Sequence, residues 1–366
     1  MKKFGKRMIC GVMTAGLALA ALTGCGSQKI DGTKTVAKVD GVEIPMGVAS
    51  FLARYQQAGT ESMYQQMMGA YGGGQDMDIW DGETEEGITY GEQAKESVET
   101  LLNQLYLLEK YAPDYGVELT EEEKAAAAAA AEGFISANSQ EVLDKIGASQ
   151  EHVQKALELQ AIQSKMFEPM TADVDTEISD EEANQSRVTL VTVSTKGTEK
   201  DEEGNTIALT DEEKAAKKEQ AGQVLEMAAA AGAEGDLDAL AKEVDENLSA
   251  SERTYTTASA KEEGTLDEAV LDAASGLTDG QVYGEVVETE DGYVVVRMDK
   301  VLDEEATESK RESILNTRKQ DLYTETLDGW VEEMPIEMVD SVWKKLKITD
   351  KESFLMKTAQ SEEAAQ

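Results

Sequence analysis

A change in hydrophobic spacing near residue 187 constrains the fold of this chain more than any other feature. Between residues 46 and 185 the apolar residues recur every three or four positions, which predicts a series of amphipathic helices. Residues 188–194 are instead rich in β-branched side chains and predict a strand, and helical spacing returns from Glu304. We therefore expect an α+β fold, in which N- and C-terminal helices pack together as a mainly helical body and a small α/β domain is inserted between them.

Local signals predict where individual elements begin. Alternating apolar residues over 36–44, interrupted by an Asp-Gly pair, predict a β-hairpin. Capping boxes at Thr120, Ser179 and Thr210 predict helix starts. Further helices are expected within 94–111, 140–146, 149–170, 237–244 and 264–274, and further strands at 282–287 and 293–298. The insert is thus expected to have the element order β-α-α-α-β-β.

The first 25 residues have the organisation of a secretory leader. Four basic residues precede an apolar run over 8–21, which is too short for a stable membrane span. The ending Leu-Thr-Gly-Cys25 resembles the lipobox of bacterial lipoproteins, a family in which this cysteine carries diacylglycerol after cleavage. The resemblance implies a signal peptide over 1–24, a lipid tether over 25–35 and a lipid-anchored position on the extracytoplasmic face of the cell membrane. The alternative is an ordinary secreted protein with an incidental cysteine.

The charge of the chain excludes some partners. Its 74 acidic and 34 basic residues give a formal net charge of -40, which repels nucleic acid and anionic lipid head groups. The other of the two cysteines, Cys10, lies within the leader. The mature body therefore has no disulfide and no thiol nucleophile.

Four segments resemble the foldase lipoproteins of Gram-positive bacteria (PrsA-like) and the periplasmic SurA-like chaperones. These segments are the hairpin at 36–44, the step between helices at 115–123, the helix and turn at 266–280, and the strand at 291–297. The last two resemble the end of a parvulin domain, the peptidyl-prolyl isomerase module of this family.

The resemblance implies a domain organisation. A helical chaperone region is expected over 36–185 and a parvulin-like domain over 186–302. C-terminal helices over 303–350 are expected to pack on the first region, and residues 351–366 are expected to form a disordered tail.

The sequence departs from the parvulin pattern at the positions that matter for catalysis. Parvulin isomerases carry one histidine on the first strand of the domain and another on the last. This chain has Thr189 or Leu190 at the first position, with the register uncertain by one residue, and Val294 at the second. Its one histidine, His152, lies in the helical region. Whether the chain is a peptidyl-prolyl isomerase of the parvulin type is therefore left open.

A methionine-rich stretch between residues 63 and 80 is the candidate client-binding surface. Methionine side chains are flexible and polarizable, so they adapt to varied apolar ligands. The candidate residues are Met63, Met67, Met68, Tyr71, Met77 and Trp80. The alternative is that the helical methionines belong to the core and that the glycines of this stretch form a loop.

No cofactor or metal site is predicted. The chain has no phosphate-binding glycine loop, dinucleotide motif or serine-histidine-acid arrangement. The acidic residues between 173 and 182 match no calcium loop and are interpreted as a solvated linker.

These observations lead to a functional hypothesis. We expect a membrane-anchored extracytoplasmic chaperone that binds unfolded or newly exported polypeptides and whose parvulin-like domain lacks strong isomerase activity. An active peptidyl-prolyl isomerase is the first alternative. A solute-binding lipoprotein is the second, although that class has two lobes with many parallel strands.

Overall fold

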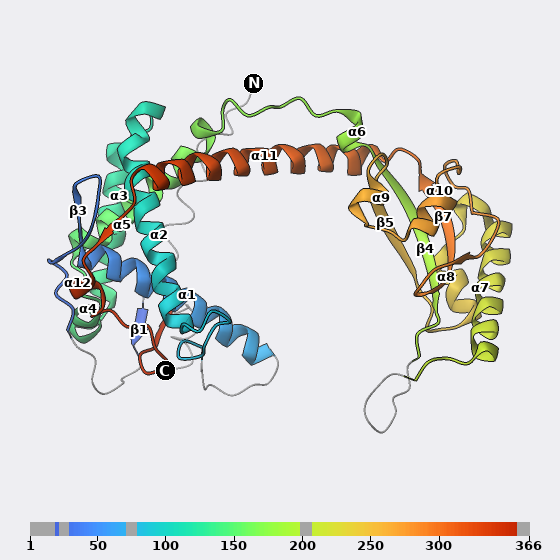
Figure 1. Ribbon diagram of the computed structural model, residues 1–366, viewed down its shortest axis with the longest axis horizontal. Coiled ribbons are helices and arrows are strands. Elements are labelled where there is room, and N and C mark those ends of the chain that lie inside the picture. The colour runs from blue at the N-terminus through green and yellow to red at the C-terminus, as the bar shows by residue number, and fades with distance from the viewer. Residues whose placement is uncertain (1–18, 22–28, 71–78, 198–206, 357–366) are drawn as a thin grey trace. The chain divides into compact units, whose positions relative to one another are not determined.

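The computed structural model describes residues 19–21, 29–70, 79–197 and 207–356 of the chain (Figure 1). Its contacts divide the chain into two compact units. Unit 1 comprises Met1–Asp173 with Gln320–Gln366, and unit 2 comprises Val174–Lys319. The two units are described separately below.

Unit 1 contains a three-stranded antiparallel sheet that joins the two ends of the chain. Strands β2 (Thr35–Val39) and β3 (Val42–Pro45) form the predicted hairpin, and β8 (Glu337–Met338) pairs with the other edge of β2. The turn residues Asp40 and Gly41 both have positive φ, at 45° and 78°. An Asp-Gly pair suits such a two-residue turn because glycine carries no Cβ to oppose a left-handed conformation.

Helices make up most of the rest of this body. They are α1 (Met46–Ala70), α2 (Tyr90–Tyr111), η1 (Ala112–Tyr115), α3 (Glu121–Ala137), α4 (Gln140–Ile146), α5 (Gln150–Met170) and α12 (Asp340–Trp343), together with the second half of α11 (Glu304–Glu333). The predicted capping box at Thr120 is present, since its side chain accepts the N–H of Glu123 and Glu123 accepts the N–H of Thr120. Among the described residues no helix is both long and apolar enough to cross a bilayer.

The N- and C-terminal helices share a core, as the sequence predicts. Trp330 of α11 stacks on Tyr111 of α2 with 4.3 Å between ring centroids. Tyr323 and Leu327 of α11 are buried in the same cluster as Met166 of α5. The predicted α+β fold with packed terminal helices is therefore confirmed.

Two terminal segments differ from the predictions. Within the expected tether, Ile30 is buried and its N–H donates to the carbonyl of Asp144 at 3.1 Å, so this part of the segment is packed on the body. The expected disordered tail is ordered over 351–356, where β9 (Phe354–Met356) pairs antiparallel with β1 (Leu19–Ala21). The prediction was wrong for these six residues because their partners lie far away in the sequence.

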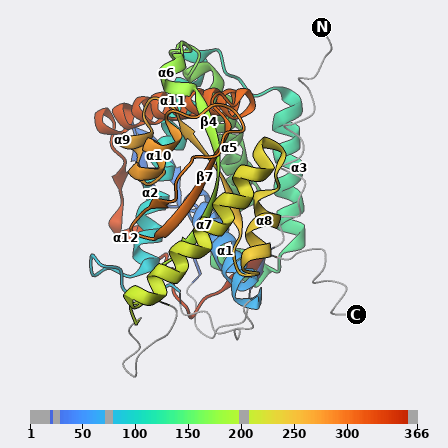
Figure 2. The same cartoon turned by 90° about the vertical axis from the view of Figure 1, so that its right-hand side faces the viewer.

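Unit 2 is built on a four-stranded antiparallel sheet. The strand order is β5-β4-β7-β6, with β4 (Gln185–Ser194) and β7 (Gly292–Lys300) at the centre and β5 (Ala250–Thr256) and β6 (Val287–Glu288) at the edges. Helices α7 (Asp211–Ala231) and α8 (Leu237–Val244) cover one face (Figure 2), and α9 (Ala260–Glu263) and α10 (Glu268–Ala274) pack on the other. Helix α6 (Asp180–Ala183) and the short η2 (Gly232–Glu234) complete the unit.

The sheet corrects two sequence predictions. Strand β5 was not predicted, because its residues Glu252, Arg253 and Thr254 are exposed and give the segment no apolar alternation. The strand expected at 282–287 is reduced to β6, and Val282 makes only an isolated bridge to Arg297. The real order of elements is therefore β-α-α-β-α-α-β-β, apart from η2 and the short α6.

Candidate functional site

The two faces of the unit 2 sheet pack against different helices. Residues directly opposite each other on neighbouring strands share a face, and successive residues alternate between faces. Leu190 of β4 is opposite Val296 of β7, and both are buried with α9 and α10. Val191 is opposite Val295, and both are buried with α7 and α8.

This register places Thr189 and Leu190 on opposite faces of the sheet. Val294 is buried in the same cluster as Leu190, on the face covered by α9 and α10. Thr189 is opposite Arg297 and so lies on the other face, where its hydroxyl donates to the carboxylate of Asp299 at 2.6 Å. The candidate pocket positions that the structure brings together are therefore Leu190 and Val294, and Thr189 belongs to a separate polar network.

The face that carries Leu190 and Val294 is filled with hydrocarbon. The exposed fractions of these two residues are 7% and 4%. The hydroxyl groups of this cluster come from Tyr255 on β5 and the partly buried Tyr283. Burial raises the pKa of Tyr255 above its ordinary value, so the phenol stays protonated at neutral pH. Tyr255 was missed as a candidate because no sequence pattern indicated β5.

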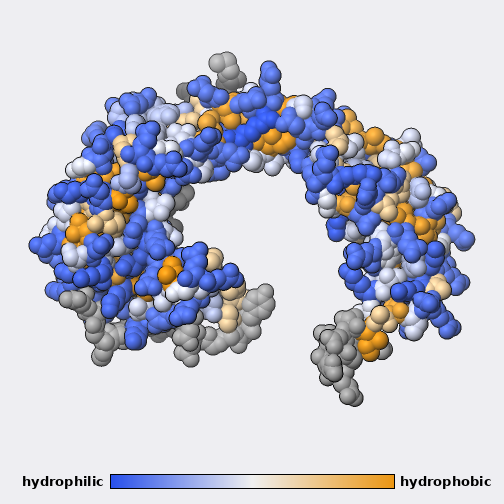
Figure 3. All heavy atoms as spheres, viewed as in Figure 1, coloured by the Kyte–Doolittle hydropathy of each residue, from blue (hydrophilic) through white to orange (hydrophobic). Residues whose placement is uncertain are grey.

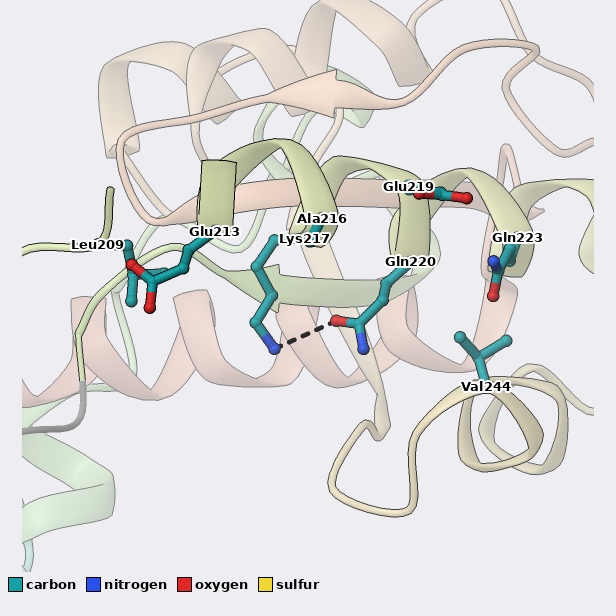
Figure 4. Close-up of a pocket in the computed structure, with 8 residues that line it drawn as sticks. All are labelled: Leu209, Glu213, Ala216, Lys217, Glu219, Gln220, Gln223 and Val244. Atoms are coloured by element: carbon teal, nitrogen blue, oxygen red, sulfur yellow. Dashed lines mark hydrogen bonds between the residues drawn. The ribbon is translucent and has the colours of Figure 1, made fainter. Parts of the chain in front are cut away.

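Two open depressions on unit 2 lie elsewhere. One, of about 510 Å³, lies between α7 and α8 and is lined by side chains that include Glu213, Lys217 and Val244 (Figure 4). The other, of about 480 Å³, is lined by residues of α6, α9 and α11. Neither is lined by Leu190 or Val294, so neither extends the candidate pocket.

The methionine-rich candidate surface in unit 1 is only partly exposed. Met63 and Met67, on the second half of α1, have exposed fractions of 68% and 51%, and Met68 is half-buried. Trp80 is buried and therefore does not belong to this surface. The remaining candidates, Tyr71 and Met77, lie outside the described residues.

Exposed apolar groups are sparse on the described surface. On the face drawn in Figure 3 the surface is largely hydrophilic, with hydrophobic residues scattered among the others. Large exposed hydrophobic side chains are few among the described residues: Val42, Met63, Met67, Tyr90, Ile207, Val301 and Leu302. Scattered apolar residues need no explanation, but two methionines one helical turn apart on α1 form a local apolar patch.

A buried polar network lies beside the inner part of α1. The carboxylate of Glu61, which is 1% exposed, accepts hydrogen bonds from the indole Nε1–H of Trp80 at 2.8 Å and the backbone N–H of Phe354 at 2.7 Å. Arg54 pairs with Glu352 at 3.0 Å. Burial lowers the pKa of Arg54, and the two carboxylates oppose that effect. The sequence offered no signal for this network, since its members are up to 298 residues apart.

His152 is partly buried and contributes to the start of α5. Its Nδ1 accepts the backbone N–H of Ser149 at 3.2 Å, which completes a capping box at the start of α5. The imidazole also packs against Gly47, where an added Cβ would lie 2.0 Å from Nδ1. Burial lowers the pKa of His152 below its ordinary value of 6.5.

Two further expectations concern ligands. Cys25, the predicted lipid attachment residue, lies outside the described residues. Within the part of the chain that the structure describes, no group of three or more His, Cys, Asp or Glu side chains is placed to hold a metal ion.

Comparison with known proteins identifies the class of unit 2. Residues 195–310 match the sequence profile of the PPIC-type PPIASE domain, the parvulin type of peptidyl-prolyl isomerase module. This chain carries a PPIC-type domain. The predicted parvulin-type domain is therefore confirmed. The matched residues begin directly after β4, so the PPIC-type match includes Val294 and Tyr255 but not Leu190.

Solved structures similar to most of the chain include a peptidylprolyl isomerase, a foldase and a chaperone. PrsA from Bacillus cereus has 19% identity and a TM-score of 0.30, with 73% of this chain and 97% of that chain covered. The foldase protein PrsA from Lactococcus lactis has 14% identity and a TM-score of 0.29, with 85% and 96% covered. A SurA-like chaperone from Campylobacter jejuni has 12% identity and a TM-score of 0.28, with 83% and 99% covered. No curated protein matches the chain.

Proposed function

We propose that this chain is an extracytoplasmic chaperone that holds unfolded or newly exported polypeptides, and that its PPIC-type domain serves as a scaffold without strong isomerase activity. The observation that carries the proposal is the pair of buried aliphatic residues, Leu190 and Val294, at the positions where parvulins are expected to carry histidines. The PPIC-type match supports the class of domain, and the filled sheet face supports the loss of its pocket.

The chemistry of prolyl isomerisation explains why this pair matters. Rotation about the peptide bond crosses a barrier of about 18–20 kcal/mol, and an isomerase must bind the twisted amide better than the planar one. Polar groups that hydrogen-bond to the twisted amide provide that preference. Leu190 and Val294 present only hydrocarbon, so they discriminate poorly between the two forms.

The holding activity is proposed to reside in unit 1. Met63 and Met67 offer adaptable apolar contacts on α1, and weak contacts of this kind suit clients of varied sequence. The net charge of -40 keeps a complex with an apolar client soluble and favours clients with basic segments.

Attachment to a membrane is a separate part of the proposal. The leader at 1–24 and the lipobox-like ending at Cys25 support lipid attachment at the extracytoplasmic face. Labelling of expressing cells with radioactive palmitate tests it. We expect label on the wild-type chain and none on Cys25→Ser, and an unlabelled wild-type chain would contradict lipid attachment.

A protease-coupled assay on Xaa-Pro peptides tests the scaffold proposal. The leaderless chain is expected to leave the isomerisation rate at its uncatalysed value while suppressing the aggregation of an unfolded client. Measurable turnover would favour the alternative, an active isomerase.

The buried phenol of Tyr255 is the group that could support catalysis if the alternative, an active isomerase, is correct. Its hydroxyl belongs to the same cluster as Leu190 and Val294 and could supply one polar group there. If turnover is found, Tyr255→Phe should abolish it. The matched control is Tyr293→Phe, because Tyr293 is buried on the opposite face with α7 and α8.

A further inference from the structure

Strand β9 is held along one edge by side chains of α1. The backbone N–H of Phe354 donates to Glu61 at 2.7 Å, and the N–H of Met356 donates to the hydroxyl of Ser62 at 3.1 Å. Successive N–H groups of an extended strand point to opposite edges. The N–H of Leu355, between these two, therefore points to the other edge of β9.

That other edge is occupied by a strand from the predicted leader. Leu355 is opposite Ala20, with Phe354 opposite Ala21 and Met356 opposite Leu19, in an antiparallel pair. All three partner residues belong to β1, which lies within the segment 1–24 that the proposed cleavage removes. The cleavage would leave the edge of β9 without its partner.

The segment that carries β9 is anchored independently of β1. Arg54 pairs with Glu352, and the side-chain amide of Gln57 donates to the carbonyl of Glu352 at 2.6 Å. The carboxylate of Asp350 accepts the backbone N–H groups of residues 79, 80 and 81 at 2.8 to 3.0 Å. Phe354 is buried in the core of unit 1. Because these contacts do not involve β1, we expect β9 to keep its place when the leader is gone.

We infer that the outer edge of β9 is a strand-addition site for an extended apolar polypeptide, and that the leader of this chain fills the site until it is removed. Strand addition uses main-chain hydrogen bonds, so it accepts many sequences, and an unfolded exported chain has such segments. The occupant in the structure, Leu-Ala-Ala, is itself short and apolar. Met63 follows Ser62 directly on α1 and Met67 lies one turn further on, and we expect both exposed side chains to give apolar contacts to a longer segment.

The inference deepens the proposed chaperone function and rests on it for the identity of the client. It also adds regulation: the precursor occupies its own site, and binding capacity appears only after the leader is cleaved. Unwanted binding of polypeptides before export would thereby be reduced.

Binding of a fluorescent peptide tests this inference. The probe is a peptide with the sequence of residues 17–23, labelled with fluorescein and extended by two lysines for solubility, and its anisotropy is measured against the protein. We expect the leaderless chain, residues 26–366, to bind the probe about tenfold or more tightly than the full chain carrying Cys25→Ser. Equal binding by the two chains would overturn the inference.

Two matched pairs of variants locate the site. In the leaderless chain, Leu355→Pro removes the N–H that points to the outer edge and should weaken binding about tenfold, whereas Leu355→Ala should stay within about threefold. In the full chain, Ala20→Pro should release β1 and raise probe binding to the leaderless level, whereas Ala20→Ser should not.

The Ala20 pair keeps the test valid if Leu355→Pro fails to fold, because it changes only the leader. Equal binding by both members of either folded pair would contradict the inference. Suppression of client aggregation is measured separately on the same chains. A leaderless chain that suppresses aggregation but does not bind the probe refutes strand addition alone, and one that binds the probe but suppresses nothing refutes the chaperone proposal alone.

Discussion

Replacing Glu61 with alanine should destabilise unit 1 strongly, because this one carboxylate accepts four hydrogen bonds in the core. Its donors are the indole N–H of Trp80, the side-chain amide of Gln57, the hydroxyl of Ser353 and the backbone N–H of Phe354. The side chains of Gln57 and Ser353 can rotate toward other partners. The donors of Trp80 and Phe354 are fixed by packing and would stay buried without an acceptor.

The magnitude follows from those two fixed donors. Each buried donor left without an acceptor costs about 1–3 kcal/mol, so the substitution should lower the free energy of unfolding by about 3 kcal/mol. A larger loss of stability is not expected, because Arg54 keeps its ion pair with Glu352 and is not left as an unpaired buried charge.

Urea unfolding followed by tryptophan fluorescence measures this loss. The three tryptophans, Trp80, Trp330 and Trp343, all belong to unit 1, so the fluorescence change reports on that unit. The matched control is Glu96→Ala on the exposed face of α2, which should change the free energy of unfolding by less than about 0.5 kcal/mol. A loss below about 1 kcal/mol for Glu61→Ala would refute the reasoning.

Three further predictions test separate parts of the account. Gly91→Ala places a Cβ 2.0 Å from the carbonyl oxygen of Ile348 and should lower the urea midpoint, whereas Gly133→Ala on an open helix face should raise stability by about 0.5–1 kcal/mol. Because burial holds the pKa of His152 below 6.5, the neutral form stabilises the fold above that pH, and stability is lost as the pH falls below it. In His152→Gln the melting temperature should fall less than in the wild type as the pH drops below 6.5. The same pH dependence in both proteins would exclude a role for His152 in this loss of stability. Thr189→Val should speed amide hydrogen exchange in β4 about fivefold or more without altering probe or client binding, and unchanged exchange would refute its role in the sheet.

Local sequence patterns predicted most helices because the forces that start a helix act over a few residues. The capping boxes at Thr120 and Thr210 are present, and α3 and α7 begin where they indicate. The hairpin of β2 and β3 was predicted for the same reason, since an Asp-Gly turn specifies its own geometry.

Elements that depend on distant partners escaped prediction. Strand β5 has an exposed, polar sequence and becomes a strand by pairing along β4. Residues 351–356 carry no helical or strand periodicity of their own, but Arg54, Gln57 and Glu61 bind them from almost 300 residues away. Patterns within a short stretch of sequence cannot predict such long-range contacts.

The candidate site shows the same limit. The sequence could place a histidine-equivalent position at Thr189 or Leu190, and only the pairing of β4 with β7 assigns Leu190 to the face of Val294. The exposure of Met63 and Met67 could not be read from their spacing, and their role in client binding stays a prediction.

The central claim is that this protein holds polypeptides without catalysing prolyl isomerisation. Refolding of a client whose slow phase is limited by prolyl isomerisation tests it most directly, with the leaderless chain present in increasing amounts. We expect the yield of folded client to rise while the rate constant of the slow phase stays unchanged. A slow phase that accelerates in proportion to the concentration of the chain would contradict it.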